Sequence, residues 1–377
     1  MSEVRMPPCH ENWLAMNEGR ELSETFEYPL FTDAHITGEV TEGYGPYQFF
    51  NTVPSQDRSG KIRPAIILRA EWYLTTDSRN AARIESTDVA YYHGGGPIDE
   101  LAALVSLALG IRCKAGGMTR LFGGKDSRGK PCAWEYDRNP ILLKRSRGSV
   151  LPRVIGSHSF ENLTPLKLLP QISPNASIAL IRAARLYQDS LWMAESETAL
   201  SWLMLVSALE TAAFYWRDAE EPPVKRLIAS KPDLFDLLKD TGIPELPERV
   251  AEKIAPSLGA TKKFIDFVLE FLPDPPAVRP PNWMQLSWDR RSMKDSLLKI
   301  YNYRSMALHG GTPVPAPMCE SPFRDQDWMA SAEIPMGLAS RSMGGTWMKK
   351  DTPMLLHTFE LISRGVLQRW WQSLVQD

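Results

Sequence analysis

The pattern of hydrophobic and polar positions changes near the middle of the 377-residue chain. Before residue 160, short runs rich in β-branched and aromatic residues are separated by clusters of Gly, Pro, Asp and Ser, which is typical of strands and turns. These runs predict strands at 36–41, 47–53, 62–73, 88–92 and 133–136. An almost wholly apolar stretch at 101–109 follows Pro97 and two acidic residues, which predicts one helix buried against the sheet.

Beyond residue 174, apolar residues recur at the three- and four-residue spacing of helices. This spacing predicts helices at 176–195, 198–216, 224–239, 247–255, 261–271, about 287–311 and 352–375. The joint between the first two is so short that they are expected to form an antiparallel hairpin. The helix at 198–216 is apolar nearly all round, which predicts the centre of a bundle. The helices at 224–271 are expected to complete that bundle around the helix at 287–311.

These patterns predict an α+β protein with two domains. Residues 1–165 would form a mixed α/β domain with a small sheet and a buried helix, and residues 166–377 an all-α bundle. A run rich in Pro and Ser at 164–174 marks the boundary. Pro313, Pro315 and Pro317 interrupt the helical pattern. The stretch 312–350 is therefore expected to be an irregular insertion, either a lid over a site or a packed segment.

The helix at 287–311 carries a charge on its apolar face. Ser287 or Asp289 can cap its start, and the Gly310-Gly311 pair ends it. Arg304 falls in the middle of a stripe formed by Met293, Leu297, Tyr301 and Leu308. Burying an unpaired guanidinium costs several kcal/mol. Arg304 must therefore meet a carboxylate, a crevice open to water, or an anionic ligand.

Two further residues extend this picture. Glu210 is the one charged residue of the helix at 198–216 and shares a seam with Leu203, Ser207 and Phe214. It is expected to lie inside the bundle as the partner of Arg304. His309 lies at the C-terminal end of its helix, where the helix dipole favours the imidazolium by roughly 0.3 to 1 kcal/mol. His309 is thus a candidate acid or base near neutral pH.

The segment Tyr301-x-Tyr303-Arg304-Ser305-x3-His309-Gly310-Gly311 resembles the Arg-x4-6-His signature of HEPN domains, in the form of the ApeA-like branch. Ala208-Leu209-Glu210 resembles the second-helix signature of the same branch, and Tyr187 and Leu191 lie on the helix before it. The resemblance covers roughly residues 173–376. It implies a helical, usually homodimeric domain that is often a metal-independent RNase; other members bind nucleotides or partners.

The resemblance implies an endoribonuclease that needs no metal or other cofactor, and it suggests a phage-defence or toxin-like setting. Arg304 would hold a phosphate and His309 would move a proton, supported by Glu210, Tyr301, Tyr303 and Ser305. Arg304 and His309 are separated by roughly 140° around the helix. A two-fold dimer that packs this helix against its copy is therefore expected to bring two such sets to one cleft.

Two other functions remain open. In the first, the helical domain is a non-catalytic nucleotide-binding or protein-interaction module, with Arg304 paired to Glu210 and His309 capping the helix. In the second, the N-terminal domain has an enzymatic activity of its own, although no nucleophile–base pair or metal-ligand spacing is found there. Otherwise the N-terminal domain is interpreted as a sensor or targeting domain.

Composition limits the partners. A net charge of −2 gives no global case for nucleic acid, so RNA contact must come from local patches. Lys144, Arg145 and Arg147 lie in a stretch without acidic residues, which is either a solvated loop or an RNA-binding surface. Four scattered cysteines fit a reducing cytoplasm. No apolar run approaches the roughly 20 residues that span a bilayer, so a cytoplasmic protein without membrane contact is expected.

Overall fold

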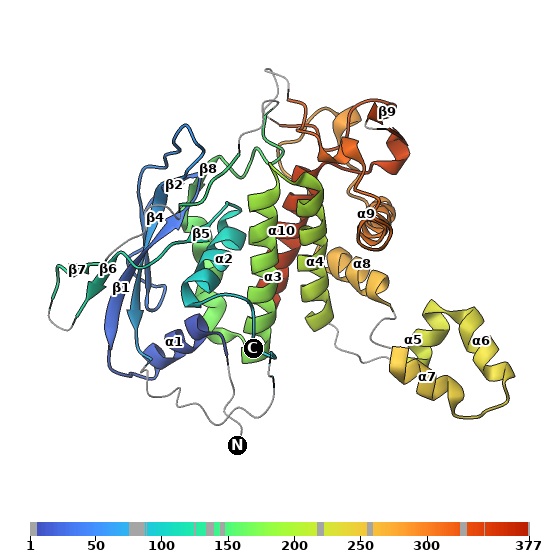
Figure 1. Ribbon diagram of the computed structural model, residues 1–377, viewed down its shortest axis with the longest axis horizontal. Helices are drawn as coiled ribbons and strands as arrows, with labels where there is room; N and C mark the ends of the chain where they lie inside the picture. Colours follow the sequence, from blue (N-terminus) through green and yellow to red (C-terminus); the bar gives the residue numbers. More distant parts are fainter. Residues whose placement is uncertain are drawn as a thin grey trace.

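The computed structural model describes residues 6–74, 87, 89–123, 126–132, 139–143, 148–216, 222–254, 259–324, 330–342 and 344–375. A small sheet lies on one side, a layer of long helices packs beside it, and a group of three short helices projects from the body (Figure 1). The protein is therefore α+β, with an N-terminal sheet followed by helices, as the sequence predicts.

The main sheet is antiparallel and has the strand order β3-β4-β1-β6-β7, with β5 also paired to β1. Its strands are β1 (Glu24–Phe31), β3 (Tyr47–Asn51), β4 (Pro64–Trp72), β5 (Lys114–Ala115), β6 (Arg120–Phe122) and β7 (Lys130–Pro131). A separate parallel pair joins β2 (His35–Thr37) to β8 (Ser157–Ser159). The strands expected at 47–53 and 62–73 are thus confirmed as β3 and β4.

Other strand predictions need correction. The central strand β1 was not predicted, because its two glutamates and a proline interrupt the alternation of polar and apolar residues. The strand expected at 36–41 is only the three-residue β2. Residues 89–92 contain a turn where a strand was expected. The strand expected at 133–136 lies outside the described residues.

Two helices flank the sheet, α1 (Pro8–Asn17), which was not predicted, and α2 (Pro97–Leu109). Asp99 caps the start of α2 by accepting a hydrogen bond from the Gly96 amide at 2.9 Å. Gly110 ends it in the left-handed conformation, with φ of 70°. Every residue from Glu100 to Leu109 is buried, which confirms the buried helix that the apolar stretch predicts.

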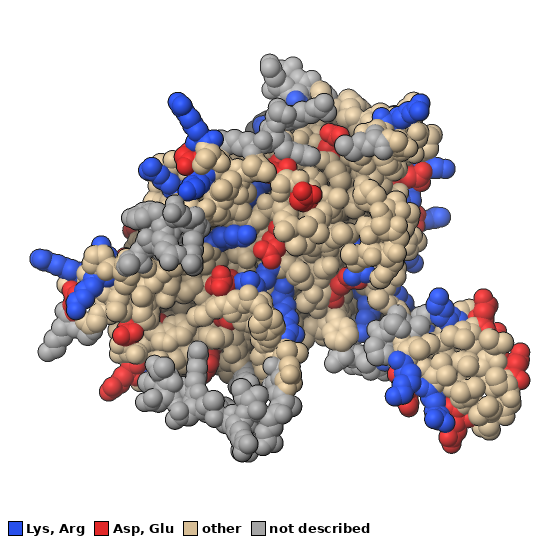
Figure 2. All heavy atoms as spheres, in the orientation of Figure 1, with Lys and Arg blue, Asp and Glu red and all other residues tan. Residues whose placement is uncertain are grey.

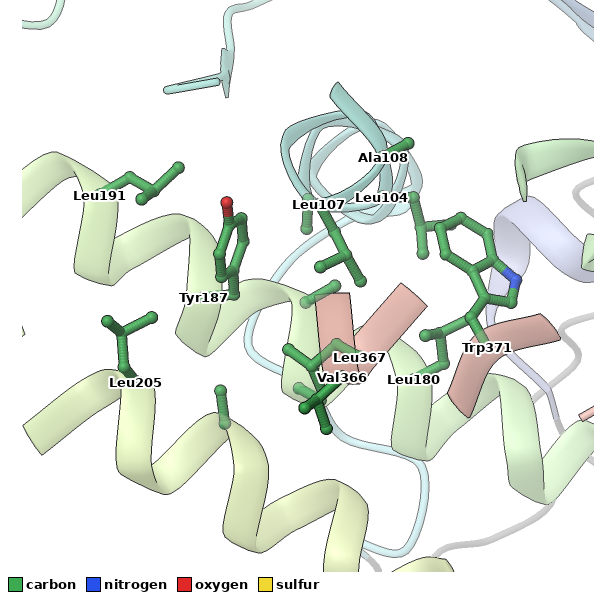
Figure 3. Packing of buried hydrophobic residues seen from close by; sticks show 14 of the residues in the cluster. Leu104, Leu107, Ala108, Leu180, Tyr187, Leu191, Leu205, Val366, Leu367 and Trp371 are labelled. Carbon is green, nitrogen blue, oxygen red and sulfur yellow. The ribbon is translucent and has the colours of Figure 1, made fainter. Parts of the chain in front are cut away.

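The long helices are α3 (Pro174–Met193), α4 (Thr198–Trp216) and α10 (Leu356–Ser373), with the 3-10 segment η3 (Phe160–Gln171) before them. α3 and α4 form the predicted hairpin. Side chains from α2, α3, α4 and α10 meet in one core (Figure 3). The same buried cluster contains residues of the sheet such as Phe49 and Leu68. A HEPN-type bundle and a boundary at 165/166 stay predictions.

The projecting helices are α5 (Pro223–Ser230), α6 (Pro232–Asp240) and α7 (Leu246–Ile254), and they surround their own small cluster at Leu227 and Ala251 (Figure 1). The expectation that they complete the bundle around the Arg304 helix is therefore wrong. The single helix expected at 224–239 is split because Lys231, which precedes Pro232, is forced out of helical geometry. We call α5–α7 the lobe.

The remaining elements include α9 (Arg290–Gly310), the helix that carries Arg304, and α8 (Ala260–Glu270), which packs against it. The others are η5 (Asn282–Met284), η6 (Ala316–Cys319), β9 (Ala339–Ser342), β10 (Gly345–Met348) and η7 (Lys349–Asp351). Much of the segment after α9 is irregular, as predicted, but part of it is packed. Met318 is fully buried, and its carbonyl accepts a hydrogen bond from the Trp202 indole at 3.3 Å.

One helix among the described residues, α4, is long and apolar enough to cross a membrane. Half of its most apolar window is buried inside the molecule. Its Trp202 ring stacks on Phe359 of α10, with ring centroids 4.8 Å apart. α4 is therefore packed against other helices along part of its surface.

Candidate functional site

α9 positions Arg304. The Asp289 carboxylate caps its start by accepting a hydrogen bond from the Ser292 amide at 2.9 Å. Gly311 ends it with φ of 65°. Met293, Leu297 and Tyr301 face the core as the stripe predicts, but Leu308 is 50% exposed. The stripe prediction is wrong at Leu308 because the last turn of α9 extends beyond the packed elements, and residues 308–310 are all exposed.

Arg304 is held by an ion pair with α4. Its Nη2 donates to Glu210 Oε2 at 2.7 Å, and the Tyr301 hydroxyl donates to Glu210 Oε1 at 2.9 Å. The guanidinium also lies 5.8 Å from the Tyr301 ring centroid. Burial, and then the negative charge of Glu210, raises the pKa of Tyr301 to about 12. The two charges that the sequence suggested as partners are thus in direct contact.

This ion pair is not deep in the core. The side chains of Arg304 and Glu210 are each 21% exposed, and Phe214, one turn beyond Glu210, is 62% exposed. The prediction that this side of α4 faces inward is therefore wrong at Phe214, whereas Glu210 is partly buried and meets Arg304 as expected. Apolar residues occur on all sides of α4, so the sequence does not show which side of the helix is exposed to solvent. Nε of Arg304 is enclosed, and it has no hydrogen-bond partner among the described residues.

His309 lies in the last turn of α9 and is exposed. Its ring makes no hydrogen bond or ion pair with the part of the chain that the structure describes. Tyr303 points elsewhere, because its hydroxyl donates to the Asp351 carbonyl at 2.5 Å. Ser305 is half-buried on the same helix. The structure thus brings Glu210, Tyr301 and Arg304 together, and leaves His309 and Tyr303 outside that contact.

A pocket of about 740 Å³ adjoins Glu210 and was missed by sequence reasoning. Its wall comes from α3, α4 and α8 and includes Arg182, Phe214 and Lys263. Arg182 and Lys263 are 81 positions apart in the sequence, so no local motif predicts that they line one pocket.

The basic residues Lys144, Arg145 and Arg147, proposed for RNA contact, lie outside the described residues. Among those that are described, no group of three His, Cys, Asp or Glu side chains is placed to hold a metal ion.

In comparisons with known proteins, no family model, no curated protein and no solved structure matches this chain.

Proposed function

We propose that this protein is a metal-independent endoribonuclease of the HEPN type, acting in the cytoplasm as a homodimer on RNA. The observation that carries the proposal is that Arg304 is held by Glu210 in an ion pair that is still partly exposed to water. Glu210 anchors Nη2 in a partly hydrated ion pair, and a guanidinium has further N–H donors for a phosphate. His309, on the same helix, is exposed and has no structural partner among the described residues.

The chemistry needs only these groups and the substrate. The ribose 2′-hydroxyl attacks the adjacent phosphorus, and the bond from phosphorus to the 5′-oxygen breaks. His309 transfers the proton of the 2′-hydroxyl to the leaving 5′-oxygen, and Arg304 stabilises the negative charge of the phosphorane. Products would carry a 2′,3′-cyclic phosphate, or its opened form, and a 5′-hydroxyl.

Dimerisation through α9 would bring the two sets of side chains to one cleft. The exposed side of α9 supports this arrangement, because Leu298 and Met306 are 42% and 46% exposed. Leu298 and Met306 are eight residues apart and so share a face of the helix. A phage-defence or toxin-like role is the setting that we propose.

A second candidate is a non-catalytic nucleotide-binding or protein-interaction module. The specific observation in its favour is the Arg304–Glu210 ion pair, which neutralises the arginine within one chain. The two candidates differ in whether His309 transfers a proton, so activity assays of His309 variants separate them.

The test is cleavage of single-stranded RNA by the pure protein in EDTA, with single-stranded DNA as a substrate that should survive. We expect His309→Ala to lower the cleavage rate by on the order of 10² or more, with fold and dimer unchanged. The matched control is His35→Ala, which removes another exposed histidine far from α9 in the sequence. Equal cleavage by wild type and a folded, dimeric His309→Ala protein would move the assignment to the interaction module.

A further inference from the structure

The pocket beside Glu210 is continuous with the Arg304 site. Phe264 of α8 forms part of its wall and packs against Tyr301, with ring centroids 5.3 Å apart. Tyr301 in turn donates to Glu210, which lines the pocket and holds Arg304. A molecule in this pocket therefore lies next to the side chain that anchors Arg304.

The wall of the pocket is positively charged. Arg182 is fixed in place by backbone carbonyls, with Nη2 donating to Ala90 at 2.7 Å and Nε to Tyr92 at 2.9 Å. Lys263 lies with its ammonium 5.1 Å from the Phe214 ring centroid. No described carboxylate pairs with either cation, and the one carboxylate in the wall, Glu210, is neutralised by Arg304. The pocket thus favours an anionic ligand.

The wall also offers a planar apolar surface. Phe214 is 62% exposed at the pocket, although burial of a phenylalanine is normally favourable. Asn175 and Thr211 add polar side chains that can meet the edge of a ring. An exposed aromatic ring near a lysine that has no carboxylate partner among the described residues is a combination that suits single-stranded nucleic acid, because the base stacks and the ammonium meets the phosphate.

We propose that this pocket seats one unpaired nucleotide of the RNA strand, with its base on Phe214 and its phosphate beside Lys263. This inference rests on the proposed function and specifies its substrate as single-stranded RNA positioned by the α3/α4/α8 pocket. A base inside a duplex stays stacked on its neighbours and does not reach Phe214, so duplex RNA binds more weakly.

The experiment measures binding separately from cleavage. The full-length protein is titrated into a fluorescein-labelled, 2′-O-methyl single-stranded oligonucleotide, which lacks the attacking hydroxyl and so survives. Phe214→Ala should weaken binding about tenfold or more, and Phe214→Tyr should restore it. Lys263→Gln should weaken binding and reduce the slope of log affinity against log salt by about 0.7, as expected for one lost phosphate contact.

Leu237→Ala is the matched control, because Leu237 is 65% exposed on the lobe and should leave binding unchanged. Wild-type affinity of folded Phe214→Ala for the oligonucleotide would overturn the pocket assignment, even if RNA cleavage is normal. Binding that depends on Phe214 in a protein that does not cleave unmodified RNA would keep the pocket and remove the RNase proposal.

Discussion

At the scale of single residues, the most informative contact is the one between Arg304 and Glu210. A dry ion pair that loses one partner costs about 3–5 kcal/mol, because a buried charge is left unpaired. Here each side chain is 21% exposed, so water can replace a lost partner. The pair is therefore better understood as an anchor that fixes the direction of Arg304 than as a large source of stability.

This view leads to a prediction for Glu210→Ala. We expect the free energy of unfolding to fall by about 1–3 kcal/mol, since Arg304 and the Tyr301 hydroxyl both lose an acceptor. Tyr301→Phe is the control that removes only one of these hydrogen bonds and should cost about 1 kcal/mol. Urea unfolding measures both. An unchanged midpoint for Glu210→Ala would mean that the contact contributes nothing in solution.

The same residues show what the sequence can and cannot reveal. A charge in an apolar stripe demands a partner, and the other isolated charge on a long apolar helix was correctly identified as that partner. The depth of the pair was not predictable, because it depends on the lobe, whose helices turn away from α4 (Figure 1). Phe214 and Leu308 were also predicted to be core residues, and both are exposed. Phe214 lines the open pocket beside α4, and Leu308 lies in the last turn of α9, beyond the packed elements.

At the scale of elements, helices were predicted reliably where capping residues and glycines mark their ends in the sequence. Asp289 and Gly311 bound α9, and Asp99 and Gly110 bound α2, close to the expected positions. Strand β1 had no such local signal. It is defined by pairing with β4 and β6, which come later in the chain. Strand pairing of this kind depends on tertiary contacts between distant segments, which local sequence patterns do not predict.

The two adjacent glycines at the end of α9 are predicted to respond in opposite ways to replacement by alanine. Gly311 has φ of 65°, and a Cβ there would meet nothing within 4 Å, so Gly311→Ala suffers backbone strain alone. We expect it to lower the free energy of unfolding by about 1–2 kcal/mol. Gly310 lies inside the helix and also has open space, so Gly310→Ala should stabilise the protein by about 0.5–1 kcal/mol. Thermal unfolding would compare them, and effects of the same sign would contradict this account of the helix end.

At the scale of the whole molecule, the sheet and the long helices share one core. Leu104 and Leu107 of α2, Tyr187 of α3 and Trp371 of α10 belong to this core (Figure 3), and strand residues belong to the same cluster. Few charged side chains are buried at this core, among them Glu100 of α2 and Glu360 of α10. In the face shown in Figure 2, charged side chains of both signs are spread over the body and the lobe. The RNA contact that we propose therefore depends on a local site, the Lys263 pocket.

A buried arginine ties the two halves together. Arg112, which follows α2, is 1% exposed. It donates to Asp33 Oδ2 at 2.7 Å, in the loop after β1, and to Glu195 Oε1 at 2.9 Å, just beyond the end of α3. Its Nε donates to the Leu191 carbonyl at 2.8 Å. Removing this side chain would leave Glu195, which is itself buried, without its charged partner.

We therefore expect Arg112→Met to lower the free energy of unfolding by about 3–5 kcal/mol. Arg112→Lys should recover part of this loss, because it keeps the charge but not the forked geometry. Urea unfolding followed by tryptophan fluorescence reports on the body alone, since the lobe contains no tryptophan. If the shared core makes sheet and helices one cooperative unit, the variant should still unfold in a single transition, shifted to lower urea. Two separated transitions would instead show that residues 1–165 and 166–377 fold as independent domains.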